Sequence, residues 1–194
     1  MKMTNVLCAL LLALPAAAIA GPSPTTTPAP APANPSSKLS DLDTQMVAHQ
    51  HAVNQTEIAM GKLAQANGSA AVKKYGATLV KDHTKGDKDI TALAKKKGVA
   101  TIPADMAMSE ADKKDQADMT SKLKGMKGAD FDRMFLDMMS AAHDREITKI
   151  DADIAVVTDA DLKTALQKTK PVLQSHSDTA KSLQKTLTSK MEMK

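Results

Sequence analysis

The chain has 194 residues, with 26 lysines and arginines against 22 acidic residues and a formal net charge of +4. Only Arg133 and Arg145 are arginines, and only Tyr75, Phe131 and Phe135 are aromatic. Nucleic-acid-binding proteins present clustered arginines and aromatic side chains on which bases stack, so the composition argues against a nucleic-acid partner. Basic and acidic residues alternate along the chain, which indicates a solvated surface.

The first twenty residues have the pattern of a secretory signal peptide. Lys2 supplies a positive charge, residues 6–14 are apolar, and residues 18–20 (Ala-Ile-Ala) form a small-x-small cleavage site. Cys8 lies within this segment, so the mature chain would have no disulfide and no thiolate ligand. No later apolar run reaches the ~18 residues that a membrane span needs. We therefore expect an exported protein without a membrane span, in the bacterial periplasm or associated with the outer envelope.

Residues 21–38 are rich in proline, alanine and threonine, and they hold six of the nine prolines. Such a segment cannot bury a core, and we predict a disordered, extended tether. It would serve as a plain spacer, or as a site of attachment or glycosylation. Residues 39–190 are predicted to form the folded domain, and residues 191–194 a tail.

From residue 40 onward the pattern is helical, and glycine and proline mark the boundaries. Ser40 and Ser69 are candidate caps at two helix starts, and Gly68, Gly98 and Gly125 follow helix ends. The predicted helices cover about residues 40–67, 69–97, 109–124 and 129–157, with a last one capped at 158–161 and ending near 189.

The lengths of the connections predict how these helices are arranged. The first two long helices are joined by a short link, as are the last two, so each pair should form an antiparallel hairpin. About thirty residues separate the hairpins, and the short helix within them would cover ~24 Å at ~1.5 Å per residue. The fold class is therefore all-α: a ferritin-like four-helix bundle, two antiparallel hairpins joined by a long crossover that contains a short helix.

Each long helix places a histidine or a carboxylate on or beside its apolar stripe, near its midpoint. At ~100° per residue, His83 and His176 lie at the centres of their stripes, Glu57 lies on its stripe, and His143 lies on a flank. Helix midpoints share one level in an antiparallel bundle, so these groups should meet within a few ångström along the axis. The predicted metal ligands are Glu57, His83, His143 and His176.

The chemistry of these residues favours a transition metal. A buried carboxylate is costly unless it is paired or bound to a metal, and neutral histidine is the commonest side-chain metal ligand. One ion of Zn, Cu, Fe or Mn would suit this set. Accessory roles are assigned to His49, to Glu146 through a His-x-x-Glu pattern, and to Asp82. Because Asp82 is adjacent to His83, it could accept a hydrogen bond from a ligand histidine, although a solvent-facing position is the simpler interpretation. His51 falls on the opposite face.

Two other interpretations of the polar groups remain open: a hydrogen-bonded core without metal, and partly solvated boundary residues. The first fits a structural or stress-related envelope protein. The methionines are most simply core packing, although thioethers also favour Cu(I). A carboxylate-bridged di-iron centre would need two Glu-x-x-His motifs, and the sequence has none. We assign no catalytic residue, and the pattern leans against an enzyme without deciding it; protein partners and oligomeric state stay open.

Five segments in order resemble the bacterial family known as domain of unknown function 4142. They are 57–64 (EIAMGKLA), 82–85 (DHTK), 97–99 (KGV) with Pro103, 131–143 and 173–176. The resemblance implies an exported ferritin-like protein, without an established activity. It marks as family positions Glu57, Asp82, His83, His143 and His176.

The chain departs from the family pattern at two positions. Ala142 stands where the family usually has an aspartate before the histidine, and Gly86 stands where it has alanine. A fainter similarity, to the copper-associated unknown-function family 305, rests on His49-x-His51 and on the run from Met138 to His143.

Overall fold

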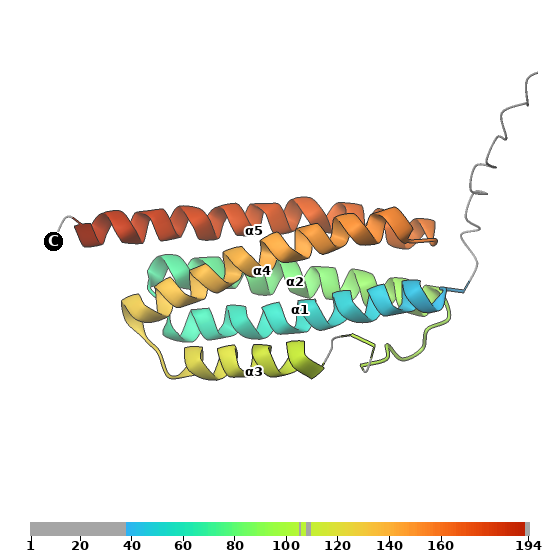
Figure 1. Ribbon diagram of the computed structural model, residues 1–194, viewed down its shortest axis with the longest axis horizontal. Coiled ribbons are helices and arrows are strands. Elements are labelled where there is room, and N and C mark those ends of the chain that lie inside the picture. The colour runs from blue at the N-terminus through green and yellow to red at the C-terminus, as the bar shows by residue number, and fades with distance from the viewer. Residues whose placement is uncertain (1–37, 105, 108–109, 193–194) are drawn as a thin grey trace, which may run out of the picture. The chain divides into compact units, whose positions relative to one another are not determined.

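The helices of this computed structural model begin and end close to the predicted positions. The described residues are 38–104, 106–107 and 110–192, and all of them belong to one unit that spans 33–194. Within them lie five α-helices and no strand: α1 (Asp41–Asn67), α2 (Ala70–Lys96), α3 (Glu110–Lys124), α4 (Gly128–Val156) and α5 (Ala160–Glu192) (Figure 1). The predicted signal peptide and tether, residues 1–37, lie outside the described residues.

Local chemistry explains where several of the long helices begin and end. Ser40 precedes α1, and its side chain accepts a hydrogen bond from Asp43 N at 3.0 Å. The buried Asp43 carboxylate in turn accepts hydrogen bonds from the backbone N and the hydroxyl of Thr158, which ties the start of α1 to the α4–α5 turn. Gly98 follows α2 with φ +81°, a left-handed conformation that favours glycine.

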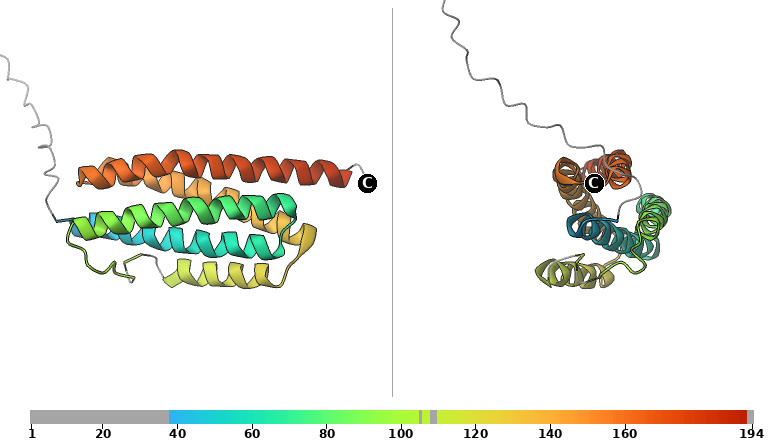
Figure 2. Two further views of the ribbon diagram at one scale, coloured as in Figure 1. Left: turned by 180° about the vertical axis from the view of Figure 1, so that it is seen from behind. Right: turned by 90° about the vertical axis from the view of Figure 1, so that its right-hand side faces the viewer.

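The long helices form the predicted bundle. α1 packs along α2 and α4 packs along α5, each pair antiparallel, while α2 contacts α5 and α1 contacts α4 (Figures 1 and 2). The crossover carries α3 along the outside of α1, so α4 runs in the same direction as α2. This confirms the ferritin-like order of two hairpins and one long crossover. Among the helices that the structure describes, none has the length and apolarity to cross a membrane.

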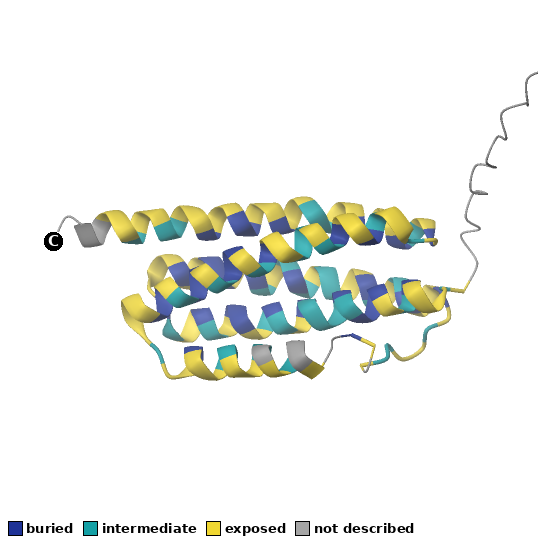
Figure 3. Cartoon of the chain, viewed as in Figure 1, coloured by how far each residue is buried: buried dark blue, intermediate teal, exposed yellow. Residues whose placement is uncertain are grey.

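Buried positions follow the inward faces of the long helices (Figure 3). The apolar ones among them form two clusters with a polar layer in between. One cluster includes Met60, Leu79 and Phe135, and the other includes Val47 and Ile150. On every long helix the predicted metal ligand falls between the two clusters in the sequence: 47–57–60 on α1, 79–83–90 on α2, 139–143–150 on α4 and 173–176–180 on α5. The bundle therefore buries these four ionisable side chains at about one level.

The α1–α2 hairpin is tightened by two glycines that face each other. A Cβ atom built on Gly76 would lie 2.6 Å from the carbonyl oxygen of Gly61 and 2.7 Å from the Cβ of Ala64. A Cβ on Gly61 would meet the carbonyl oxygen of Gly76 at 2.7 Å. The two backbones thus approach more closely than any side chain at these positions would allow.

Substitution of Gly76 by alanine should destabilise the bundle. Overpacking costs about 1–3 kcal/mol, and the contact with a backbone oxygen places Gly76→Ala toward the upper end, above the ~1 kcal/mol that alanine gains over glycine in a helix interior. We expect a net loss of about 1–2 kcal/mol in urea denaturation followed by circular dichroism. Gly125→Ala is the control, because its Cβ would meet only Lys122 O, at 3.6 Å. Equal or greater stability of Gly76→Ala would contradict the close approach.

Candidate metal centre

Three histidine rings from three helices meet in the polar layer. His83 on α2, His143 on α4 and His176 on α5 are 4%, 1% and 2% exposed. Their ring centroids lie 5.9 Å apart for the first two, and each lies 5.2 Å from the ring of His176. One possible donor atom from each residue lies within 4.8 Å of the other two, so the three side chains can hold a metal ion. This is the juxtaposition that the helix midpoints predict.

One nitrogen of each ring is held by a hydrogen bond, within the same helix for His143 and to a neighbouring helix for the other two. His83 Nδ1 donates to Asn54 Oδ1 at 2.9 Å, and His143 Nδ1 donates to the Met139 carbonyl at 2.7 Å. His176 Nε2 donates to Asp82 Oδ2 at 3.1 Å. Because these nitrogens carry the proton of a neutral imidazole, the lone pair falls on the other nitrogen of each ring. Ligand histidines in metal sites are commonly fixed in this way.

The nitrogens that remain are buried and have no hydrogen-bond partner in the described part of the chain. They are His83 Nε2, His143 Nε2 and His176 Nδ1. Buried polar atoms in folded proteins are normally paired, so each exception calls for an explanation. Three lone pairs at one level, on rings held by other contacts, form a donor set suited to a divalent transition metal.

The pKa values of His83 and His176 agree with neutral imidazole donors. Burial, and to a lesser extent the neighbouring imidazoles of His176 and His143, lower the pKa of His83 to about 3. Burial also lowers the pKa of His176, against the opposing effect of Asp82. At neutral pH both rings are therefore unprotonated, and a metal ion would not have to displace a proton from them.

Glu57 lies beside the three histidines but not among them. It is 6% exposed, its Oε2 has no hydrogen-bond partner in the described residues, and burial raises its pKa. The opposing effect of His143 on this pKa shows that the two groups are near one another. However, no described carboxylate joins the group whose donor atoms lie within 4.8 Å. A direct bond from Glu57 to a metal stays a prediction.

The accessory residues have different places. Asp82 accepts a hydrogen bond from His176 on the neighbouring helix α5. It is not the acceptor for His83, which is adjacent to it in the sequence. His49 and Glu146 form a separate cluster: His49 Nε2 bonds Glu146 Oε2 at 2.9 Å, and Gln50 Nε2 donates to Glu146 Oε1 at 2.6 Å. Although burial alone lowers it, the pKa of His49 is raised by its bond to Glu146. These two residues are held by each other and not by the histidine group.

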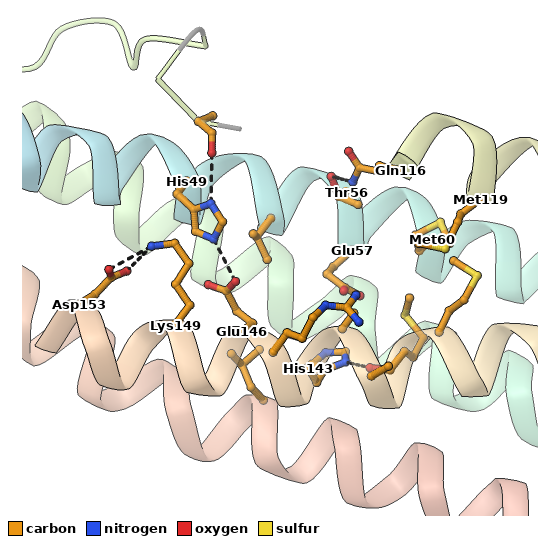
Figure 4. A pocket seen from close by; sticks show the side chains of 18 of the residues that line it. His49, Thr56, Glu57, Met60, Gln116, Met119, His143, Glu146, Lys149 and Asp153 are labelled. Atoms are coloured by element: carbon orange, nitrogen blue, oxygen red, sulfur yellow. Dashed lines mark hydrogen bonds and ion pairs between the residues drawn. The ribbon is translucent and has the colours of Figure 1, made fainter. Parts of the chain in front are cut away.

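His49 also joins the crossover to the bundle. Its Nδ1 lies 3.1 Å from the carbonyl oxygen of Ala107 (Figure 4). α3 is attached to α1 by bonds from Gln116 to Thr56 and from Thr120 to the sulfur of Met60. The crossover thus touches α1 at three places, one of them through a residue that the sequence places near the metal site.

Sequence reasoning missed one residue that orients a ring, and a second that holds the backbone of a candidate ligand. Asn54, one helical turn before Glu57, accepts the bond from His83, and its Oδ1 would lie 3.1 Å from a Cβ on Gly86. Gly86, noted as a departure from the family pattern, therefore leaves the room that the amide occupies. Tyr75 donates to the backbone carbonyl of His176 at 3.1 Å. For Asn54, the available signal in the sequence was an amide three positions before the inward Glu57.

Fold and site together define a ferritin-like helical bundle with a buried three-histidine donor set. The model of a family described as a domain of unknown function (DUF4142) matches residues 28–183, so the chain belongs to that family. Neither the search of curated proteins nor the search of solved structures gave a match. The predicted family is thereby confirmed, and the function has to be argued from the site.

The depressed pKa of His83 predicts a pH dependence of stability in metal-free protein. The imidazole has a pKa near 6.5 when unfolded and about 3 when folded. Acid therefore favours the unfolded state: the His83 contribution is absent above the unfolded pKa and grows as pH falls toward 3. By linkage it amounts to about 2 kcal/mol at pH 5.

The measurement is urea denaturation of chelator-treated protein at pH 7.5 and pH 5. Between these pH values wild type should lose about 2 kcal/mol more than His83→Gln, which lacks the titrating group. His51→Gln is the control, because His51 is partly exposed and bonds Asp87 away from the site. Equal losses in wild type and His83→Gln would show that the ring is not buried in a neutral form.

Proposed function

We propose that this protein is an exported bundle that binds one divalent transition-metal ion through His83, His143 and His176. The observation that carries the proposal is the arrangement of the three rings: each has one nitrogen fixed by a hydrogen bond and the other buried without a partner in the described residues. Export rests on the signal-peptide pattern of residues 1–20.

The donor set favours some metals over others. Imidazole suits Zn, Cu, Fe and Ni, whereas Mg and Ca prefer oxygen ligands. Every donor in the group is a histidine, and the chain after residue 20 contains no cysteine. A borderline divalent ion such as Zn²⁺ or Cu²⁺ is the natural occupant, and Co²⁺ is a spectroscopic substitute for Zn²⁺ in such a site.

Loss of one histidine should abolish tight binding. Calorimetric titration of chelator-treated protein with Zn²⁺ is expected to give one site per chain, and His83→Ala or His143→Ala should weaken it at least a hundredfold. His51→Ala should bind as wild type does, because His51 lies outside the group. Circular dichroism of each variant establishes that it folds.

A different result would favour the alternative, a structural or stress-related envelope protein with a metal-free polar core. Wild type with no calorimetric signal and no rise in Tm upon addition of Zn²⁺, Cu²⁺, Fe²⁺ or Mn²⁺ would refute metal binding. Metal binding that persists in both alanine variants would place the ion elsewhere.

Asp82 should matter for affinity without touching the ion. Its carboxylate holds His176 Nε2–H and so keeps the lone pair on Nδ1. Loss of such a partner typically costs 10- to 100-fold in metal affinity, and Asp82→Asn should weaken Zn²⁺ binding by about that factor. Asp89→Asn is the matched control, since Asp89 pairs with Lys85 on the exposed face of the same helix. Equal affinity in the two variants would contradict the assigned role.

A further inference from the structure

A large cavity lies beside the histidine group, between α1, α3 and α4 (Figure 4). Its volume is about 1220 Å³, well above what a few water molecules need. Small-molecule sites usually measure about 300–1,000 Å³. The cavity exists because α1 packs closely along α2 but contacts α4 at few positions. The space between α1 and α4, on the side that α3 partly covers, is therefore the cavity.

The lining of the cavity is mainly apolar and rich in sulfur. Thioethers from the bundle and the crossover contribute to it, together with aliphatic side chains such as Val53 and Leu173. The methionines are Met46, Met60, Met106, Met119, Met138 and Met139. Flexible, polarisable methionines form adaptable surfaces for apolar ligands. Core packing explains the three that are buried, but it does not explain why six of them face one cavity.

Two polar groups connect this cavity to the histidine group. His143 and Glu57 both line it, from α4 and α1 (Figure 4). The other lining carboxylates already have partners: Glu146 bonds His49 and Gln50, Asp153 pairs with Lys149, and Asp137 accepts from Gln184. Glu57 is the buried carboxyl whose Oε2 lacks a partner in the described residues. It is thus free to contact a molecule in the cavity.

Three histidines do not complete the coordination of a divalent ion. Zinc sites with three protein ligands keep the fourth position for water or an exogenous molecule, whereas structural sites are closed by four. Among the described residues, no fourth His, Cys, Asp or Glu has a donor atom in the group. The fourth donor atom would therefore come from outside the three histidines. Because His143 lines the cavity, a molecule in the cavity can supply that atom.

We infer that the cavity binds a small molecule with an apolar body and an oxygen-donor head, such as a carboxylate or hydroxamate, whose head occupies the fourth position of the metal. The inference rests on the proposed function, because the head needs the metal. The body lies among the methionines, and Glu57 hydrogen-bonds the head and does not bind the metal. The cavity is then the binding site for an exchangeable ligand.

The test uses two hydroxamates with the same head and different bodies. Acetohydroxamate and octanohydroxamate are titrated into Co²⁺-loaded protein, and the visible Co²⁺ absorption reports a change of ligand. Six further methylenes that become buried should tighten binding at least about tenfold. Gel filtration and metal analysis after the titration establish that cobalt stays on the protein.

A pair of valine substitutions tests whether the apolar body of the ligand lies in the cavity. Val53 is half-buried and lines the cavity, whereas Val172 on α5 is 38% exposed and does not. Val53→Trp should keep Co²⁺ binding and lose the advantage of the longer chain, and Val172→Trp should keep both. Glu57→Gln should retain Co²⁺ and bind octanohydroxamate several-fold more weakly.

The outcomes separate this inference from the proposed function. Failure of wild type to bind Co²⁺ refutes the metal site itself. Co²⁺ binding with no spectral response to either hydroxamate, or with equal affinity for both, overturns the inference and leaves the metal site standing. So does identical behaviour of the two tryptophan variants. Loss of Co²⁺ from Glu57→Gln would make Glu57 the fourth ligand and the centre a closed one.

Discussion

The structure depends on one constraint: four ionisable side chains are buried at the same level of the bundle, between two apolar clusters. An unpaired polar group that is buried in such an interior costs free energy, and an apolar cluster flanks this layer on either side along the bundle. One nitrogen of each imidazole is paired, with Asn54, the Met139 carbonyl or Asp82. The other nitrogen of each ring has an inward lone pair, which a metal ion would bind.

The two sides of the bundle differ in how closely their helices approach, and this difference decides where chemistry can take place. On the α1–α2 side Gly61 and Gly76 bring the backbones into contact, so the interior is closed. On the α1–α4 side the contacts are few, and methionines line the space that α3 partly covers. On the closely packed α1–α2 side, Asn54 positions His83. On the α1–α4 side, His143 and Glu57 line the cavity.

Much of the fold and part of the site could be predicted from the sequence, because both depend on helical periodicity. The positions of Gly68, Gly98 and Gly125 and of the caps located the helix ends to within a few residues. The central places of His83 and His176 on their stripes required only ~100° per residue. Periodicity could not separate Glu57 from the histidines, because an angle and a depth do not specify how far a side chain reaches across the bundle. The same limit applied to His49 and Glu146, which pair with each other.

The sequence by itself determined that the chain is a helical bundle with histidines and a carboxylate at mid-height. It did so because amphipathic periodicity and short links leave few other ways to bury the apolar stripes. Only the tertiary structure decided which nitrogen of His83 and of His176 faces inward, since that depends on acceptors from other helices: Asn54 for His83 and Asp82 for His176. It alone also decided that α1 and α4 stand apart, because the spacing of two helices follows from side chains that meet across the bundle and not from the order in which they occur along the chain.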